Sequence, residues 1–86
     1  MPELSRFYGI IVRMYFGDHD PPHVHVEYSG SQAVVTIETL ALIGGTLPPR
    51  ALGLVAEWGL QHRAELLAAW ARASRLEQPG RIPPLP

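Results

Sequence analysis

The segment from Asp18 to His25 holds most of the side chains in this sequence that could carry out chemistry. It contains three histidines and two aspartates and is interrupted by two consecutive prolines. His23 and His25 are two positions apart in a stretch with the alternation of a strand, which would place both imidazoles on one side with Cα atoms about 6.5–7 Å apart. Such a pair can share a metal ion, or it can act as acid and base on one substrate.

Two kinds of site remain open for this segment. In a metal site, His23 and His25 would be two ligands, typically of zinc. His19 or Asp18 from the preceding turn would then supply a third. In a catalytic site, the two imidazoles would exchange protons with a substrate. A His-x-His pair on a strand is also typical of a solvated sheet face without any chemical role. The histidine-triad hydrolase pattern is not present, because its third position is occupied by Glu27.

Arg63 is the second residue in a distinctive position. The predicted helix places it near the middle of an apolar stripe, close to Gly59 and Trp70. Because an unpaired buried charge is costly, Arg63 is expected either to extend to solvent along its stem or to have a hydrogen-bond partner. That partner would be a carboxylate, a backbone carbonyl or a bound anion. His62 lies on the flank of the stripe, where packing is a simpler interpretation than a ligand role.

The first half of the chain has the alternation and the β-branched residues of strands that are separated by turn residues. Strands are expected at residues 7–16, 23–28 and 32–38, with a short fourth strand at 40–43. In the second of these, Val24 and Val26 would face the core, so His23 and His25 would face away from it. The histidines would then meet the helix only if the sheet curls or if a second subunit covers that face.

The second half predicts one long helix from Arg50 to about Arg75, which begins after two prolines. Its apolar stripe is expected to consist of Leu52, Val55, Ala56, Gly59, Leu66, Leu67 and Trp70. Gly59 disfavours a helix by about 1 kcal/mol relative to alanine, so close packing or a kink is expected there. The proline-rich residues 78–86 cannot be helical and are expected to be extended.

Together these elements predict an α+β fold. It consists of an antiparallel sheet of three to four strands, followed by one long C-terminal helix that packs on one face of the sheet. Residues 1–77 would form a single domain, and residues 78–86 would form a proline-rich extended tail.

Composition limits the class of protein. With 86 residues, of which 47% are hydrophobic, the chain is expected to form one small folded domain. Without cysteine, neither disulfides nor a thiolate metal site can stabilise it. The net charge of −1 argues against a strongly basic nucleic-acid module, although all seven basic residues are arginine. The sequence has neither a membrane-spanning apolar stretch nor a signal-peptide pattern, so the cytoplasm is the expected location.

These segments resemble a small bacterial and archaeal family known as domain of unknown function 4160, over nearly the whole chain. The residues that carry the resemblance are Ser5 to Tyr15, Asp18 to Tyr28, Leu47 to Leu52, Trp58 and His62 to Leu66. The most specific part is the Pro-Pro-His-x-His run from Pro21 to His25. Residues 40–45 depart from the family pattern, because they are more apolar than the polar hairpin typical of that region.

The resemblance implies a partner more directly than a mechanism. Family members are often encoded beside a small protein known as domain of unknown function 2442. The pair resembles a toxin–antitoxin module, which would imply RNA or translation as a target. A toxin would be expected to cleave RNA without a metal, with proton exchange by His23 and His25. Arg13 or Arg63 would stabilise the charge of the phosphorane. The alternatives are a non-catalytic domain that binds zinc or a similar ion through His19, His23 and His25, and a protein-interaction domain, either of which could be a homodimer.

Overall fold

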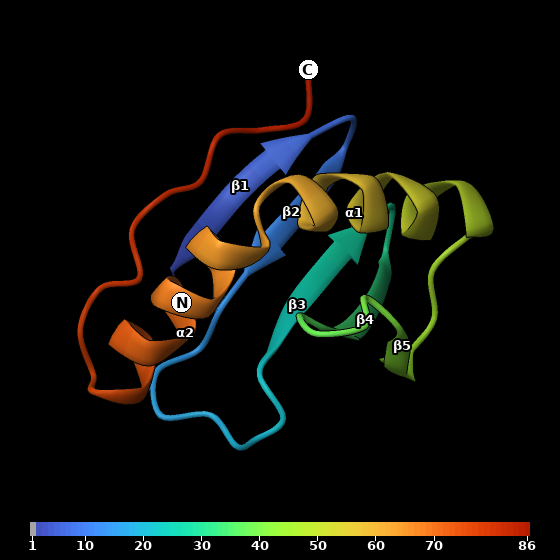
Figure 1. The fold of residues 1–86 in the computed structure, drawn as a ribbon. Helices are drawn as coiled ribbons and strands as arrows, with labels where there is room; N and C mark the ends of the chain where they lie inside the picture. The colour runs from blue at the N-terminus through green and yellow to red at the C-terminus, as the bar shows by residue number, and fades with distance from the viewer. Residues whose placement is uncertain (1) are drawn as a thin grey trace.

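A computed structural model describes residues 2–86 as one antiparallel sheet with two helices packed against it (Figure 1). The five strands lie in the sheet in chain order, so each strand is joined to its neighbour by a turn or a loop. The elements are β1 (Glu3–Phe7), β2 (Ile10–Arg13), β3 (His23–Tyr28), β4 (Ser31–Thr36), β5 (Leu42–Gly45), α1 (Pro49–Gln61) and α2 (Arg63–Ser74). Neither helix in this part of the chain has the length and apolarity needed to cross a lipid bilayer.

The α+β fold with an antiparallel sheet confirms the prediction from the sequence, but the predicted three to four strands and one long helix are wrong. The strand expected at residues 7–16 contains a hairpin turn, because Phe7 ends β1 and Ile10 begins β2. Tyr8 and Gly9 between them have positive φ angles of 51° and 80°. Two successive residues with positive φ form the tight turn that joins antiparallel strands. β1 is therefore an additional strand, upstream of the predicted one.

The predicted long helix is divided in two at His62, whose φ of −124° lies outside the helical range. The predicted stripe is nevertheless buried on both sides of the break, at Val55 and Gly59 in α1 and at Leu66 and Trp70 in α2. Leu67, which was expected in the stripe, is 44% exposed, and Arg63 is the first residue of α2. The buried helix residues are Ala51, Val55, Trp58 and Gly59 in α1, and Leu66, Ala69, Trp70 and Ala73 in α2.

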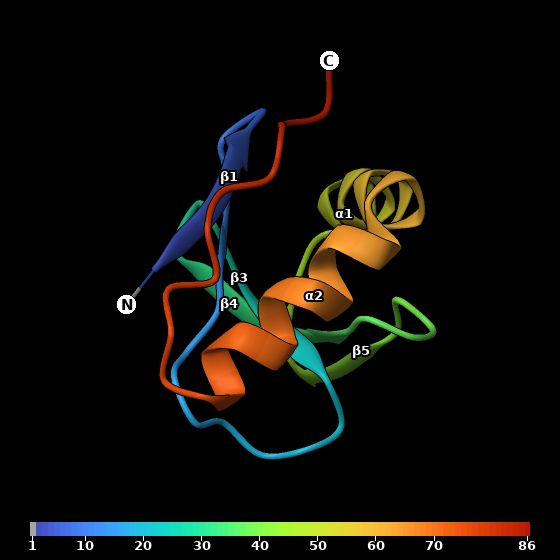
Figure 2. The ribbon, with the colours of Figure 1, turned by 60° about the vertical axis from the view of Figure 1, so that its left-hand side comes forward.

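Both helices lie on the same face of the sheet, and no other segment of residues 2–86 covers the opposite face (Figure 2). Val24 and Val26 belong to the core and are almost fully buried, as their alternation predicts. Packing is very close at Gly59, where an added Cβ would lie 2.4 Å from a side-chain carbon of Leu40. This contact confirms the close packing expected at Gly59.

The proline-rich tail, residues 78–86, runs in an extended path beside β1 (Figure 1). Ile82 and Leu85 are buried against the domain. The Ile82 amide donates a hydrogen bond to the Leu4 carbonyl at 2.9 Å. The indole of Trp58 donates to the Pro83 carbonyl at 2.8 Å. The tail therefore completes the core and occupies the outer edge of β1.

Ser5 is a buried polar residue whose replacement by alanine should stabilise the fold. It is 1% exposed, and its hydroxyl has no hydrogen-bond partner among the described residues. Because an unsatisfied buried hydroxyl costs about 1–3 kcal/mol, Ser5→Ala is expected to raise the free energy of unfolding by about 1 kcal/mol in urea denaturation. The matched control is Thr36→Val, which should lower it, because the Thr36 hydroxyl bonds to Thr39 and to the Ala41 amide. A less stable Ser5→Ala protein would contradict the prediction.

Candidate functional site

The loop between β2 and β3 carries the histidine-rich segment and is held against α2. The Gly17 amide donates a hydrogen bond to the Ala73 carbonyl, near the end of α2, at 3.1 Å. In the next residue, Oδ1 of Asp18 accepts a 2.9 Å hydrogen bond from the His19 amide. This local contact uses one of the two carboxylate oxygens of Asp18. It leaves the second oxygen of Asp18, Oδ2, directed toward the start of β3.

Asp18 lies between the imidazoles of His23 and His25, and we call these three residues the Asp18 group. The Oδ2 atom of Asp18 is 2.8 Å from Nε2 of His23 and 3.0 Å from Nε2 of His25. The ring centroids of the two histidines are 5.1 Å apart. One ligand atom from each of the three residues lies within 4.8 Å of the other two. The structure therefore places an aspartate of the turn beside both histidines.

His23 is the most buried member of the Asp18 group, with 8% of its surface exposed. Its Nδ1 atom lies 2.7 Å from the carbonyl oxygen of Pro21. Because a carbonyl oxygen can only accept, Nδ1 carries a hydrogen, and Nε2 is the nitrogen directed at Asp18. The indole of Trp70 packs against the ring at a centroid distance of 5.1 Å. The imidazole is therefore oriented both by a hydrogen bond and by an aromatic contact.

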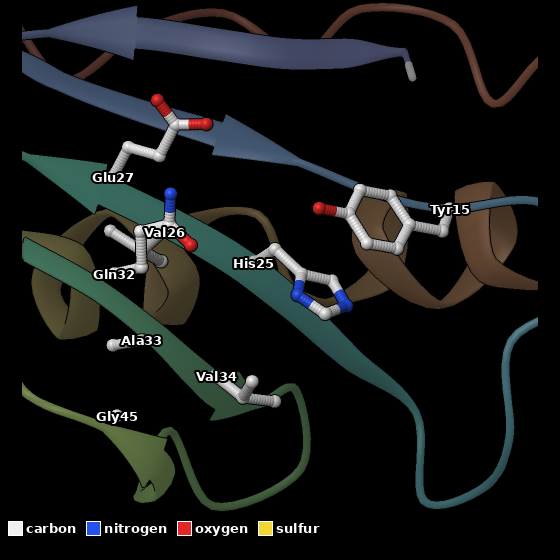
Figure 3. Close-up of a pocket in the computed structure, with 8 residues that line it drawn as sticks. All are labelled: Tyr15, His25, Val26, Glu27, Gln32, Ala33, Val34 and Gly45. Carbon is white, nitrogen blue, oxygen red and sulfur yellow. The ribbon is translucent and has the colours of Figure 1, made fainter.

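His25 lies on the uncovered face of the sheet. Tyr15 stacks on it, with ring centroids 4.0 Å apart and an angle of 17° between the ring planes. His25 also borders a depression on this face with a volume of about 280 Å³, whose lining side chains are drawn in Figure 3. The depression is lined by Tyr15, His25, Val26, Glu27, Gln32, Ala33, Val34 and Gly45. Because Nε2 of His25 points to Asp18, its other ring nitrogen is the one that can meet a molecule in the depression.

The carboxylate of Asp18 is ionised over the whole physiological pH range. Its partial burial acts to raise its pKa. Hydrogen bonds from His25, from the His19 amide and from His23 outweigh this effect and lower the pKa to about 2. The group therefore presents a negative oxygen to two imidazole nitrogens, which is an arrangement that favours a cation, either a proton or a metal ion.

The other predicted site residues do not join the Asp18 group. The side chain of His19 is exposed, and the described contact of this residue with Asp18 is through its backbone amide, so the prediction of His19 as third ligand is not supported. Arg13 is opposite His25 in the register of β2 and β3. Its Nε atom, however, donates to Oε1 of Glu27 at 3.0 Å. Arg13 is therefore near the site and is engaged by a carboxylate of its own.

Arg63 lies apart from the Asp18 group, at the start of α2. Its Nε atom donates to the Ile37 carbonyl at 3.3 Å, which confirms that it is not an unpaired charge. His62 contacts Oε1 of Glu65 through Nδ1 at 2.6 Å. Within residues 2–86, neither Arg63 nor His62 has a described hydrogen bond to the Asp18 group. The geometry does not support a role for Arg63 beside the two histidines.

Tyr15 and Trp70 contact the histidines of the site, but the sequence alone does not identify them as site residues. Tyr15 lies on the same side as Arg13 by simple alternation, so the sequence did contain a signal for its position near the histidines. Trp70 is far from His23 in the chain, and its helix periodicity indicates only that it is buried. Trp70 reaches the site because α2 passes the end of the sheet beside the β2–β3 loop (Figure 2).

Comparison with known proteins gives a match to one family. A model of the family described as Domain of unknown function (DUF4160) matches residues 9–71. The matched region is more than half of the chain, and it contains β2 to β5, α1 and the whole Asp18 group. No curated protein and no solved structure matches the chain.

Proposed function

This chain belongs to the family described as domain of unknown function 4160, and on that premise we propose that it is a divalent-metal-binding component of a two-protein, toxin–antitoxin-like module. The observation that carries the metal part of the proposal is the convergence of three ligand atoms, from Asp18, His23 and His25, within 4.8 Å of one another. The two-protein part is supported by the resemblance of the sequence to this family.

Two imidazole nitrogens and one carboxylate oxygen form a ligand set that suits zinc and other divalent transition metals. In a tetrahedral zinc site with bonds of about 2.0–2.1 Å, neighbouring ligand atoms are about 3.3 Å apart. The two distances from Asp18 to the histidines are 2.8 and 3.0 Å. These two distances would each lengthen by about 0.3–0.5 Å around an ion, and a fourth position would remain for water or another ligand.

The surroundings of His23 support this proposal. A histidine that binds a metal through one ring nitrogen usually donates the hydrogen of the other nitrogen to a carboxylate or a backbone carbonyl. The Pro21 carbonyl takes this place, 2.7 Å from Nδ1 of His23. This contact uses the Nδ1 hydrogen and turns Nε2 toward Asp18, so the ring is already oriented for an ion that replaces the hydrogen on Nε2.

Metal-independent proton transfer by His23 and His25 fits the geometry less well. An acid–base pair needs two nitrogens that face the substrate, whereas both Nε2 atoms point at the carboxylate of Asp18. His23 also has its Nδ1 bonded to Pro21. Of the two histidines, His25 borders the depression and can reach a molecule there. Metal binding is therefore the function that the geometry supports best.

The test is a zinc titration of protein that was purified without a polyhistidine tag, followed by calorimetry and by NMR of the histidine ring protons. We expect one zinc ion per chain, with the signals of His23 and His25 shifting together. The signals of His19 and His62 should not move. Binding should release protons, because the ion replaces hydrogens on the ring nitrogens. An absence of saturable binding, or shifts at His19 in place of His25, would exclude the proposed site.

The partner is tested by co-expression with the product of the adjacent gene. Co-purification of the two proteins, and growth arrest that the neighbouring gene relieves, would support the two-protein module. An absence of both effects would contradict it without bearing on the metal site. RNA or translation as the target remains a prediction from the family resemblance.

A further inference from the structure

The two edges of the sheet differ in how they are protected. β1 forms one edge, and the tail occupies it through the hydrogen bond of 2.9 Å from the Ile82 amide to the Leu4 carbonyl. Arg81 strengthens this contact with a 3.2 Å bond to Glu3. β5 forms the other edge and, among the described strands, pairs with β4 alone (Figure 1). A strand at an open edge presents backbone donors and acceptors that can pair with another strand.

β5 also has exposed apolar side chains. Leu42 is 37% exposed and Ile43 is 53% exposed, although both are large and hydrophobic. Residues 39–49, which include the whole strand, contain no charged side chain. Natural edge strands are commonly protected from pairing by lysine or by another charge, and β5 has no such protection. Its composition therefore favours contact with a further strand.

We propose that β5 pairs antiparallel with β5 of a second copy of this chain, so that one sheet continues through both copies. The occupied β1 edge explains why the partner strand is β5. Identical chains that joined β5 to β1 would grow into an open array, but the tail blocks β1. Pairing of β5 with itself is symmetric and closes after two copies. The uncharged segment 39–49 meets its own copy without repulsion between like charges.

The pairing would bring both Asp18 groups onto one face of the joined sheet. Two identical antiparallel strands are related by a two-fold axis perpendicular to the sheet, so each face of one copy continues into the same face of the other. The depression beside His25 extends to Gly45, at the end of β5. A Cβ at Gly45 would lie 2.0 Å from the Gln32 carbonyl oxygen, so this position must be glycine. Because Gly45 belongs to β5, the depression would be separated from the second copy by this one strand.

The test is the molar mass of the full, tag-free chain, measured by multi-angle light scattering over a range of concentrations. A strand of four residues gives a small interface, so we expect a weak dimer, whose mass rises from 9.5 kDa toward twice that value. With a dissociation constant on the order of 10 μM, as expected for a small interface, the rise should be nearly complete at about 0.5 mM. Ile43→Lys should weaken the dimer by at least about tenfold, because it places a lysine from each copy at the β5–β5 interface. There the two positive charges would repel each other or lose contact with water. Leu60→Lys, at a 63% exposed position in α1, should leave the dimer unchanged.

Amide hydrogen exchange on the unmodified chain gives a second measurement that does not depend on the folding of a variant. The outward amides of Leu42 to Gly45 should become protected as the concentration rises, whereas exchange at the exposed surface of α2 should not change. A monomer at every concentration would overturn the proposal. So would a dimer that Leu60→Lys breaks and Ile43→Lys leaves intact, or protection that appears elsewhere and not in β5.

Discussion

Asp18→Asn is expected to weaken zinc binding by at least about a hundredfold, because the loss of a metal ligand exceeds the 10–100-fold effect of losing an outer hydrogen-bond partner. The substitution removes the negative oxygen that lies 2.8 Å from His23 and 3.0 Å from His25. An amide oxygen of the same size is a much poorer partner for zinc and leaves two imidazoles without the anion between them. Calorimetric titration of both proteins measures the difference.

Asp20→Asn is the matched control, because it makes the same chemical change at an exposed position of the same turn. Its zinc affinity should equal that of the unmodified chain. His19→Gln should behave in the same way, since the side chain of His19 is also exposed. An equal loss in Asp18→Asn and Asp20→Asn would mean that general negative charge, rather than the Asp18 group, attracts the ion.

Asp18→Asn should also change how the free energy of unfolding of the metal-free protein depends on pH. Burial opposes ionisation of Asp18, but bonds from His25, His19 and His23 lower its pKa from 3.8 to about 2 in the folded chain. A pKa that is lower in the folded chain means that the carboxylate stabilises the fold above the unfolded pKa, and that this contribution is lost as pH falls toward the folded pKa. In urea denaturation, Asp18→Asn should therefore be less stable than the unmodified chain above about pH 5, and the difference should disappear as pH falls below about 2. A difference that is constant with pH would contradict this assignment.

Trp58→Ala is expected to lower the free energy of unfolding by about 3–5 kcal/mol. Typical domains have only about 5–15 kcal/mol in total, so the variant should be close to unfolded. Trp58 is fully buried, and its ring centroid lies 5.4 Å from that of Phe7 in β1. Its indole also donates to the Pro83 carbonyl at 2.8 Å. The substitution thus leaves a cavity between α1 and the sheet and releases the tail. Urea denaturation, with circular dichroism as the signal, measures the loss.

Trp58→Phe separates the two effects of that change. It keeps most of the ring volume and removes the hydrogen-bond donor, so it should cost about 1 kcal/mol. Exchange of the Ile82 amide should become faster, because the tail loses one of its anchors. Leu67→Ala changes an exposed residue of α2 and should alter stability by less than about 0.5 kcal/mol. If Trp58→Ala matched Leu67→Ala, the described packing of α1 on the sheet would be wrong.

The side of the sheet that carries the histidines is predictable from the sequence, because alternation is a local property of the chain. Val24 and Val26 must both enter the core once β3 is extended, and His25 and Glu27 then take the uncovered face. The proximity of Asp18 to the pair follows from a short loop with two prolines, which cannot carry that residue far from the start of β3.

The element boundaries are less predictable, because they depend on conformations without a strong local signal. Tyr8 adopts a positive φ of 51°, which is uncommon for a residue other than glycine or asparagine. The alternation of residues 7–16 therefore indicates one continuous strand, although the chain turns at Tyr8 and Gly9. The helix break at His62 likewise contains neither proline nor glycine at the break itself, and the helical pattern on both sides reads as continuous.

The identity of the third member of the Asp18 group was decided by the tertiary structure. His19 and Asp18 are neighbours in one turn, and residue types alone permit either as a ligand. The contact of Gly17 with Ala73 fixes the path of the loop against α2, and this path turns the Asp18 carboxylate inward and leaves His19 exposed. Trp70 and the tail depend on long-range packing in the same way. Helical periodicity indicates that a side chain is buried. The assembly of the whole core then determines which distant residues it contacts.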